Sequence, residues 1–302
     1  MWSKEGRVRL IEKASTKTKR ILITGANSYI GNAFTQYATS MRPAYQIEKL
    51  SLRNIDWDQV DLQGVDAILH CAGIAHNATK TSDTDQYFAV NQGLTDRMAR
   101  LARQAGVPHF IYMSSMIVYG NTSRSGEINL DTPLTPENAY GQSKLAGEEA
   151  LNKLAGDDFK VTIIRAPMVY GLHSKGNYPL LAKFSRLSPI FPEFDNKRSM
   201  IYIENLAELI CQVIDQQIEG IIHPQNQDYV STANLVHEIA KQHDKKIYLT
   251  SIFNGVISLM IKYPLIQKVF GDRYYSKDLS AWPYDSYQVC SFEESIRRTE
   301  QQ

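Results

Sequence analysis

Short runs of apolar and β-branched residues alternate with longer amphipathic stretches over the first 170 residues of this chain. The runs predict strands at residues 20–24, 45–52, 66–70, 109–114 and 161–166. The stretches between them predict helices at residues 31–40, 89–105 and 139–154. Strands that alternate with helices in this way form βαβ units. The pattern therefore predicts an α/β fold with a doubly wound parallel sheet.

The pattern loosens after Gly171 and predicts a smaller second part. Short strands are expected at residues 199–203 and 220–223, helices at 204–216 and 234–242, and a proline-punctuated loop at 188–196. We divide the chain into an N-terminal extension that we expect to be flexible, a sheet domain and a smaller C-terminal lobe. The extension covers residues 1–18, the sheet domain residues 19–170 with 199–226 returning to it, and the lobe residues 171–302.

One segment of the second part, residues 252–270, is apolar enough to raise the question of a membrane span. Lys262 and Pro264 interrupt it, so the apolar stretch is too short and broken to cross a bilayer. We expect a buried helix of the C-terminal lobe here. A contact with a membrane surface is the alternative, because amphipathic helices can lie in the plane of the interface.

Composition narrows the classes of partner. The 302 residues are 43% hydrophobic and 22% charged, with a net charge of +1, which gives no reason to expect nucleic acid as a partner. Cys71, Cys211 and Cys290 lie far apart, without the spacing of a zinc site or a disulfide framework. No apolar core marks a signal peptide in the first twenty residues. We expect a cytoplasmic protein with no transmembrane segment and no metal site.

A glycine loop, TGANSYIG at residues 24–31, lies between the first strand and its helix. Gly25 permits a tight turn, and Gly31 lets the helix pack closely on the sheet. The helix N-terminus offers free N–H groups and a partial positive charge. In this context the loop predicts a binding site for the pyrophosphate of a dinucleotide.

The end of the second strand bears on which dinucleotide is bound. An acidic residue there bonds the ribose 2′-hydroxyl of NAD, whereas a nearby Arg accommodates the 2′-phosphate of NADP. The chain has Ser51 and Arg53 at this point, which favours NADP. Glu48 would be the acid, and NAD the cofactor, only if the strand ended three residues earlier.

Tyr140 and Lys144 are four residues apart in a predicted helix, and they follow a predicted strand that leads into Ser114 and Ser115. Residues with this spacing lie on one face of a helix. A phenol with an ordinary pKa of about 10 is a poor acid–base group at neutral pH, and a neighbouring ammonium lowers that pKa. The pair thus suits proton transfer to or from an alcohol or ketone.

Together these motifs resemble the extended short-chain dehydrogenase/reductases, which have a Rossmann-type sheet and a smaller substrate-binding lobe. The glycine loop matches T-G-x-x-G-x-x-G except at Ser28, which replaces the middle glycine. That replacement narrows the approach of the backbone to the phosphates, although the Ser28 hydroxyl could itself bond one. Residues 115–120 match S-x-x-V-Y-G, residues 140–144 match Y-x-x-x-K, and residues 165–171 read RAPMVYG.

The resemblance implies a role for each matched residue. Ser115 donates to a carbonyl oxygen, Tyr140 transfers the proton, and Lys144 lowers the Tyr140 pKa and bonds the nicotinamide ribose. Asn91 supports the loop and strand positions rather than the chemistry. The implied contacts of the NADP or NAD cofactor are Gly25, Asn27, Ser28, Tyr29, Ile30, Gly31, Ser51, Arg53, Ala72, Gly73, Asn91, Tyr140, Lys144, Pro167 and Val169.

Two further matches bear on the reaction. Sugar-nucleotide dehydratases of this family carry Asp-Glu directly after the catalytic Ser or Thr, whereas this chain has Met116 and Ile117, which cannot exchange protons. Dehydration is therefore not expected. Arg198 matches an Arg that pairs with the substrate diphosphate, as a guanidinium can do through paired N–H bonds. Asn177 is a candidate sugar contact, so Ser115, Asn177 and Arg198 form the expected substrate site.

The motifs most resemble bacterial 4-ketoreductases of UDP-N-acetyl-hexosamines and the related 4-epimerases. We expect an NADP-dependent reduction at C4 of a UDP-4-keto-hexosamine. An NAD-dependent UDP-sugar 4-epimerase is the alternative, and a non-catalytic NADP-sensing protein is a third possibility. The resemblance also implies a homodimer.

Overall fold

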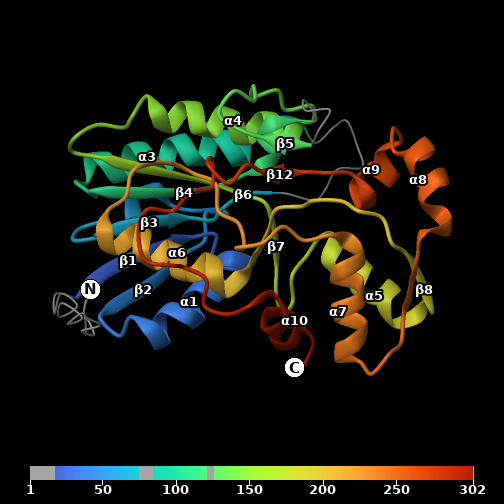
Figure 1. Ribbon diagram of the computed structural model, residues 1–302. Coiled ribbons are helices and arrows are strands. Elements are labelled where there is room, and N and C mark those ends of the chain that lie inside the picture. The colour runs from blue at the N-terminus through green and yellow to red at the C-terminus, as the bar shows by residue number, and fades with distance from the viewer. Residues whose placement is uncertain (1–17, 75–83, 121–125, 302) are drawn as a thin grey trace, which may run out of the picture.

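The computed structural model describes residues 18–74, 84–120 and 126–301, so most of the predicted N-terminal extension lies outside the described residues. A six-stranded parallel sheet forms the centre of the described chain (Figure 1). Its order is β2-β1-β3-β4-β6-β10. The strands are β1 (Lys19–Thr24), β2 (Tyr45–Leu50), β3 (Ala67–His70), β4 (His109–Ser115), β6 (Lys160–Ala166) and β10 (Gly220–Ile222).

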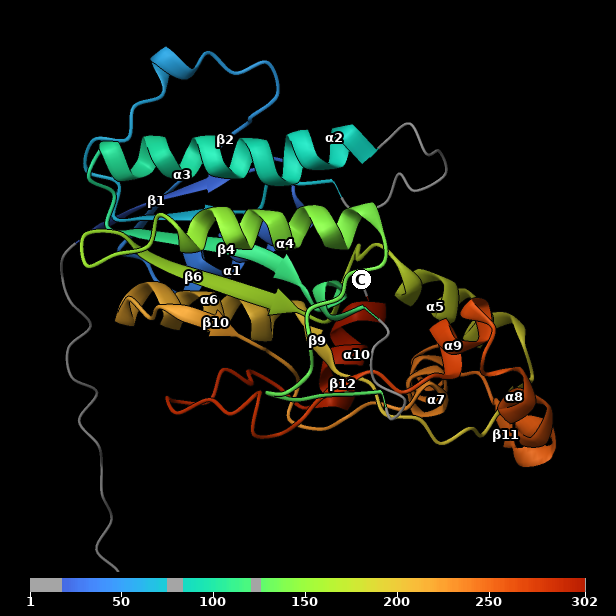
Figure 2. The same ribbon diagram turned by 90° about the horizontal axis from the view of Figure 1, so that it is seen from above.

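Helices cover both faces of this sheet (Figure 1). On one face lie α1 (Tyr29–Met41) and α6 (Ile203–Gln216), and on the other α3 (Thr95–Gln104) and α4 (Ala139–Asn152), which run side by side (Figure 2). Each face has its own apolar core. A strand covered on both faces can be buried along its whole length, as in β3, where three apolar residues and His70 are all buried. The predicted α/β fold with a doubly wound parallel sheet is confirmed.

The helix predicted at residues 89–105 begins earlier and is irregular. It starts with α2 (Thr84–Phe88), continues through a π-helical turn, η3 (Ala89–Leu94), and then becomes α3. π-Helical turns are rare and occur frequently at functional sites. This one contains Asn91, a predicted site residue, which is fully buried.

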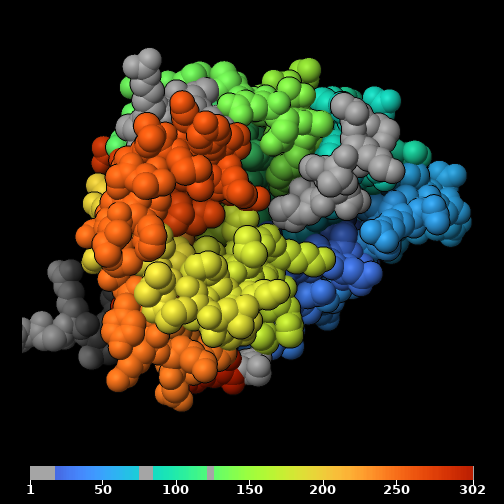
Figure 3. Space-filling model, turned by 90° about the vertical axis from the view of Figure 1, so that its right-hand side faces the viewer, coloured from blue at the N-terminus to red at the C-terminus, as the bar shows by residue number. Residues whose placement is uncertain are grey.

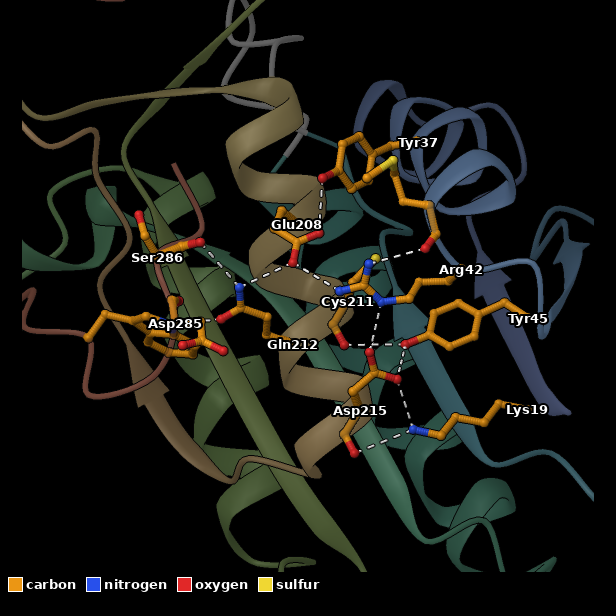
Figure 4. A network of polar contacts seen from close by, with 12 residues as sticks. Lys19, Tyr37, Arg42, Tyr45, Glu208, Cys211, Gln212, Asp215, Asp285 and Ser286 are labelled. Carbon is orange, nitrogen blue, oxygen red and sulfur yellow. Dashed lines mark hydrogen bonds and ion pairs between the residues drawn. The ribbon is translucent and has the colours of Figure 1, made fainter. Parts of the chain in front are cut away.

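A polar network fastens α6 to the edge of the sheet and to the end of α1 (Figure 4). Asp215 of α6 accepts hydrogen bonds from Arg42 Nε at 2.9 Å, Tyr45 OH at 2.7 Å and Lys19 Nζ at 3.0 Å. Arg42 also donates to Glu208, which lies seven residues before Asp215 in α6, at 2.9 Å. The network therefore holds a helix from the second half of the chain against the first strands.

The remaining elements form a smaller lobe beyond the carboxyl ends of the main strands (Figures 1 and 2). Its helices include α5 (Asn177–Leu187) and α7 (Thr232–Gln242). The expected loop at residues 188–196 contains a short strand, β8 (Ile190–Pro192), which pairs in parallel with β11 (Tyr248–Thr250). Other short strand pairs are β7 (Met168–Tyr170) with β9 (Met200–Tyr202) and β5 (Glu127–Ile128) with β12 (Tyr274–Tyr275). The last helix is α10 (Phe292–Glu300).

The expectation of a buried helix at residues 252–270 is wrong. The segment forms a 3-10 turn, η5 (Ser251–Phe253), and two short helices, α8 (Asn254–Met260) and α9 (Pro264–Phe270), because Pro264 starts a new helix. Among the described residues of both helices, only Ile257 is buried. Over the described part of the chain, no helix is long and apolar enough to cross a membrane.

Candidate active site

Tyr140, Ser115 and Lys144 come together where β4 meets the start of α4. Asn138 caps α4 by accepting a hydrogen bond from Gly141 N at 2.8 Å, and this places Tyr140 in the first turn. Ser115 is the last residue of β4, and its side chain lies near enough to the Tyr140 phenol to lower the pKa of that phenol. Lys144 lies one turn further along α4 and donates to Met113 O of β4 at 2.8 Å. The predicted triad therefore forms one cluster.

The expected lowering of the Tyr140 pKa is wrong for this structure. Burial raises the pKa of Tyr140 to about 12, and the neighbouring Ser115 side chain only partly opposes this rise. The Lys144 ammonium does not act on the phenol as expected, because it bonds Met113 O and lies 4.6 Å from the centre of the Tyr112 ring. Burial also lowers the pKa of Lys144 to about 8. At neutral pH Tyr140 therefore carries its proton and can act as a donor.

A second phenol, Tyr87 of α2, lies beside Tyr140 and was not among the predicted site residues. The two ring centres are 6.1 Å apart, with the rings tilted by 52°. The Tyr87 hydroxyl is buried and has no hydrogen-bond partner among the described residues. No motif in the sequence marks Tyr87, because its position beside Tyr140 follows from the packing of α2 on α4.

Asn91 links the loop after β3 to α4. Its amide accepts from Ile74 N at 2.9 Å and donates to Ile74 O at 3.1 Å and to Ser143 Oγ at 3.0 Å. Gly73 is enclosed by the same group, since a Cβ there would lie 2.9 Å from Asn91 Oδ1 and 3.2 Å from Lys144 Nζ. Asn91 thus holds the loop that faces the lysine, and its contact with a dinucleotide stays a prediction.

The glycine loop lies at the point where the strand order of the sheet reverses, between β1 and β3. In doubly wound sheets ligands bind at this point, outside the carboxyl ends of the strands. Gly25 has a φ of +83°, and a Cβ on it would lie 2.8 Å from the backbone nitrogen of Ala72, which follows β3. Only glycine therefore allows these two chain segments to approach so closely.

Ser28, the departure from the family pattern, is the N-cap of α1. Its φ of −69° and ψ of 142° suit any residue, and its hydroxyl accepts a hydrogen bond from Gly31 N at 3.1 Å. A Cβ on Gly31 would lie only 2.5 Å from this hydroxyl. In this structure the Ser28 oxygen therefore stabilises the helix start, and Gly31 leaves room for it.

The other loop residues fit a dinucleotide diphosphate. Asn27 is exposed in the loop, and Ile30 packs on the core below it. Tyr29 has a buried hydroxyl that lacks a partner among the described residues, and it lies 2.8 Å from where a Cβ on Gly171 would be. A buried polar atom without a partner is costly, so a ligand oxygen would stabilise it. These residues would hold the dinucleotide, whose nicotinamide supplies or accepts the hydride in this chemistry.

At the other end of the predicted dinucleotide site, β2 ends at Leu50, and Ser51 and Arg53 follow in an exposed turn. Glu48 lies inside the strand, and its carboxylate accepts from Arg20 Nε at 2.7 Å and Nη2 at 3.1 Å. The strand therefore does not end at Glu48, and the acid is already paired with the neighbouring strand. With Glu48 paired to Arg20, Ser51 and Arg53 are the candidate side chains for contact with the dinucleotide ribose after β2.

The predicted substrate residues Asn177 and Arg198 line one cavity in the smaller lobe. Met168, between the predicted cofactor contacts Pro167 and Val169, lines the same cavity, as do Leu180 and Lys268. Arg198 donates to Gly271 O at 3.0 Å. The structure thus brings the predicted substrate residues near the end of β6, where the predicted cofactor contacts Pro167 and Val169 lie.

Arg273 is a site residue that the sequence analysis missed. It forms a β-bridge with Arg198, and its guanidinium donates to Met116 O, next to Ser115, at 3.2 Å. Burial, and to a lesser degree Arg273, lower the pKa of Arg198 to about 10. Two guanidinium groups held close together favour an anion between them. The sequence around Arg273, Gly271-Asp272-Arg273, matches no motif used above, so the pairing of Arg273 with Arg198 is seen only in the fold.

A parallel α/β sheet with a glycine loop at its switch point and a Ser–Tyr–Lys cluster beside it defines a nicotinamide-dependent oxidoreductase. Residues 21–226 match the NAD dependent epimerase/dehydratase family. This match spans more than half of the chain, and the chain belongs to that family.

Two relatives and one solved structure show what the chain is similar to. A UDP-glucose 4-epimerase of Vibrio cholerae is 29% identical over 259 residues, 75% of this chain and 76% of that protein. An N-acetyl-alpha-D-glucosaminyl-diphospho-ditrans,octacis-undecaprenol 4-epimerase of Escherichia coli O157:H7 is 25% identical over 292 residues, 84% of this chain and 82% of that protein. The structure of a Bacillus anthracis dTDP-4-dehydrorhamnose reductase in complex with NADP matches 93% of this chain and 98% of its own, with a TM-score of 0.70 and 20% identity. The chain is accordingly an NAD(P)-dependent enzyme of the nucleotide-sugar epimerase and reductase class.

Proposed function

We propose that the protein reduces the C4 ketone of a UDP-4-keto-hexosamine with NADPH. The observation that carries this proposal is the end of β2, where Ser51 and Arg53 are exposed and Glu48 is paired with Arg20. An Arg at this point accommodates the 2′-phosphate of NADP, which a reductase consumes as an exchangeable substrate. An epimerase that recycles its hydride usually retains NAD instead.

The state of Tyr140 also supports a reductase. Because burial keeps the phenol protonated, Tyr140 can give a proton to the oxygen that becomes the C4 hydroxyl. Ser115, whose side chain neighbours the Tyr140 phenol, would donate to the same oxygen as negative charge develops on it. Lys144 would bind the nicotinamide ribose next to Ser115 and Tyr140.

The substrate end of the site suits a sugar joined to a diphosphate. Arg198 and Arg273 would bind the diphosphate, and Asn177 would contact the sugar at the mouth of the same cavity. Arg273 also contacts the residue next to Ser115, so a diphosphate bound there would lie about one sugar ring away from C4 at the catalytic cluster. We propose UDP as the nucleotide.

An NAD-dependent UDP-sugar 4-epimerase is the second candidate, and the similarity to the Vibrio cholerae UDP-glucose 4-epimerase favours it. A non-catalytic NADP-sensing protein has less support, because Ser115, Tyr140 and Lys144 are all present and clustered. We further propose a cytoplasmic homodimer that associates through α3 and α4. For the domains we propose residues 19–170 with 199–226 as the dinucleotide domain and 171–302 as the substrate lobe.

The cofactor that the protein holds after purification separates the two candidates. The protein is denatured, and the released dinucleotide is identified; separate assays follow NADPH oxidation with a UDP-4-keto-hexosamine and the interconversion of UDP-GlcNAc and UDP-GalNAc. We expect little bound cofactor and rapid NADPH oxidation. Stoichiometric bound NAD with interconversion, and no NADPH oxidation, would establish the epimerase instead.

A further inference from the structure

A group of large apolar side chains is exposed on the side of the smaller lobe that faces away from the central sheet. They lie on α5, η5, α8 and α9 and in the turn between the last two helices. The group, which we call the apolar face, comprises Leu180, Phe184, Leu187, Ile252, Phe253, Val256, Leu259, Met260, Tyr263 and Leu265. Figure 3 looks onto this end of the molecule and shows α8 and α9 (orange) beside α5 (yellow).

Most side chains of the apolar face are not buried in the folded chain, so packing within the protein does not explain why they are apolar. Ile252 is 83% exposed and Leu259 76%, whereas Ile257 is the one buried residue among the described residues of α8 and α9. On α5, Leu180, Phe184 and Leu187 repeat at the spacing of one helix face, and that face points to solvent. Contiguous exposed apolar surface of this kind marks an interaction site.

Basic residues accompany the apolar face, and acidic residues are absent from the segments that form it. Lys183 of α5, Lys262 before α9 and Lys268 in α9 are all exposed, as is Arg186 of α5, which lies 3.8 Å from the Glu300 carboxylate. In the sequence, no Asp or Glu occurs at residues 171–192 or 245–271, although the whole chain carries a net charge of only +1. Positive charge is therefore concentrated around the apolar side chains.

The apolar face also continues into the substrate cavity. Leu180 and Leu265 belong both to the exposed group and to the cavity lining. The same cavity contains Asn177, Arg198 and Lys268, which are the groups suited to a sugar diphosphate. A partner that covers the apolar face would thus lie directly at the mouth of this cavity.

We propose that the apolar face docks on the surface of an anionic lipid bilayer. Exposed apolar side chains would enter the boundary between headgroups and acyl chains, and Lys183, Lys262 and Lys268 would meet the lipid phosphates. A second copy of the chain is a poorer occupant, because a two-fold contact would bring the same basic residues against each other. Docking places the mouth of the substrate cavity at the membrane surface, and it does not depend on which reaction the site performs.

Vesicle binding tests this docking. The full-length protein is sedimented with vesicles of phosphatidylcholine alone and of an equimolar mixture with phosphatidylglycerol, at low and high salt. The double variant Ile252→Glu, Leu259→Glu disrupts the apolar face without touching the catalytic or cavity residues. Met41→Glu, at the end of α1, is the control because it places the same charge on an exposed apolar position elsewhere.

We expect the wild-type protein to bind the anionic vesicles, more weakly at high salt, and to bind neutral vesicles poorly. The double variant should bind at least about ten-fold more weakly, while Met41→Glu binds like the wild type. No binding by the wild type, or an equal loss in Met41→Glu, would overturn the proposal. Self-association that the double variant abolishes, in a protein that does not bind vesicles, would show instead that the face joins two copies.

Turnover distinguishes a failure of this docking from a failure of the proposed function. The double variant should retain wild-type turnover of a soluble UDP-sugar and the wild-type unfolding temperature, since both changed side chains are exposed. A protein that binds vesicles but lacks reductase activity would leave the docking intact and refute only the proposed reaction.

Discussion

The ion pair between Glu148 of α4 and Arg165 of β6 lies under the catalytic cluster, and its removal should be costly. The two side chains are 2% and 7% exposed. Glu148 accepts from Arg165 Nη2 at 2.7 Å and Nε at 3.2 Å, and it also accepts from the Ser114 hydroxyl. Glu148→Ala removes all of these bonds at once. The guanidinium keeps its bond to Tyr119 OH at 2.7 Å but has no carboxylate beside it.

The magnitude follows from the burial of the remaining charge. Removal of one partner of a buried pair leaves an uncompensated charge, which costs about 3–5 kcal/mol. Glu148→Gln keeps the shape of the side chain and one acceptor, so we expect a smaller loss of about 1.5–3 kcal/mol. A double variant, Glu148→Leu with Arg165→Met, removes both charges and should recover at least half of the loss seen in Glu148→Ala.

Equilibrium unfolding in urea measures these free energies. Arg100→Ala, which breaks the exposed pair with Asp96 on α3, is the control and should lose much less stability. A loss below about 1 kcal/mol in Glu148→Ala would show that the buried pair is not a structural support. A double variant as unstable as Glu148→Ala would show that the loss comes from packing rather than from the unpaired charge.

Three further predictions concern the site. Because burial lowers the pKa of Lys144 to about 8, kcat/KM for reduction should be level near neutral pH and fall above about pH 8, as the ammonium loses its proton. The charge of Glu148 raises the pKa of Lys144, so the variant Glu148→Gln should show this fall at a lower pH. A level profile up to pH 10 would contradict this. Arg198→Ala removes a charged contact to the diphosphate, so in steady-state assays it should raise KM for the UDP-sugar about 10–100-fold, with a smaller change in kcat. An unchanged KM would show that Arg198 does not bind the substrate. Arg53→Ala should raise KM for NADPH and leave KM for NADH unchanged, and equal effects on both would refute its role at the 2′-phosphate.

Much of the sheet domain could be predicted because its strands are buried on both faces. Runs such as residues 20–24 and 161–166 are mostly apolar, and the structure places them in one parallel sheet as β1 and β6, with β3 and β4 between them. The glycine loop was also predictable, since a turn that must pass close to another strand demands glycine at a fixed position. Gly25 against Ala72 is that case.

Properties that depend on distant neighbours could not be predicted in the same way. The apolar run at residues 252–270 indicated burial, yet Ile257 is the one buried residue among the described residues of α8 and α9, and apolar composition alone cannot reveal that. The Tyr140 pKa depends on burial by surrounding elements and on where the Lys144 ammonium points. Arg273 joins Arg198 only through a backbone bridge across the fold.

The fate of a labelled hydride tests the central claim, reduction at C4 by the Ser115, Tyr140 and Lys144 cluster, most directly. The protein is incubated with NADPH deuterated at the transferable position and a UDP-4-keto-hexosamine, and the product is analysed by mass spectrometry and NMR. We predict one deuterium at C4 for each NADPH oxidised, and a loss of turnover of about 100-fold or more in Tyr140→Phe, whose fold and dinucleotide binding are retained. Unchanged turnover in Tyr140→Phe, or no NADPH oxidation and no deuterium at C4 of the sugar, would contradict the account.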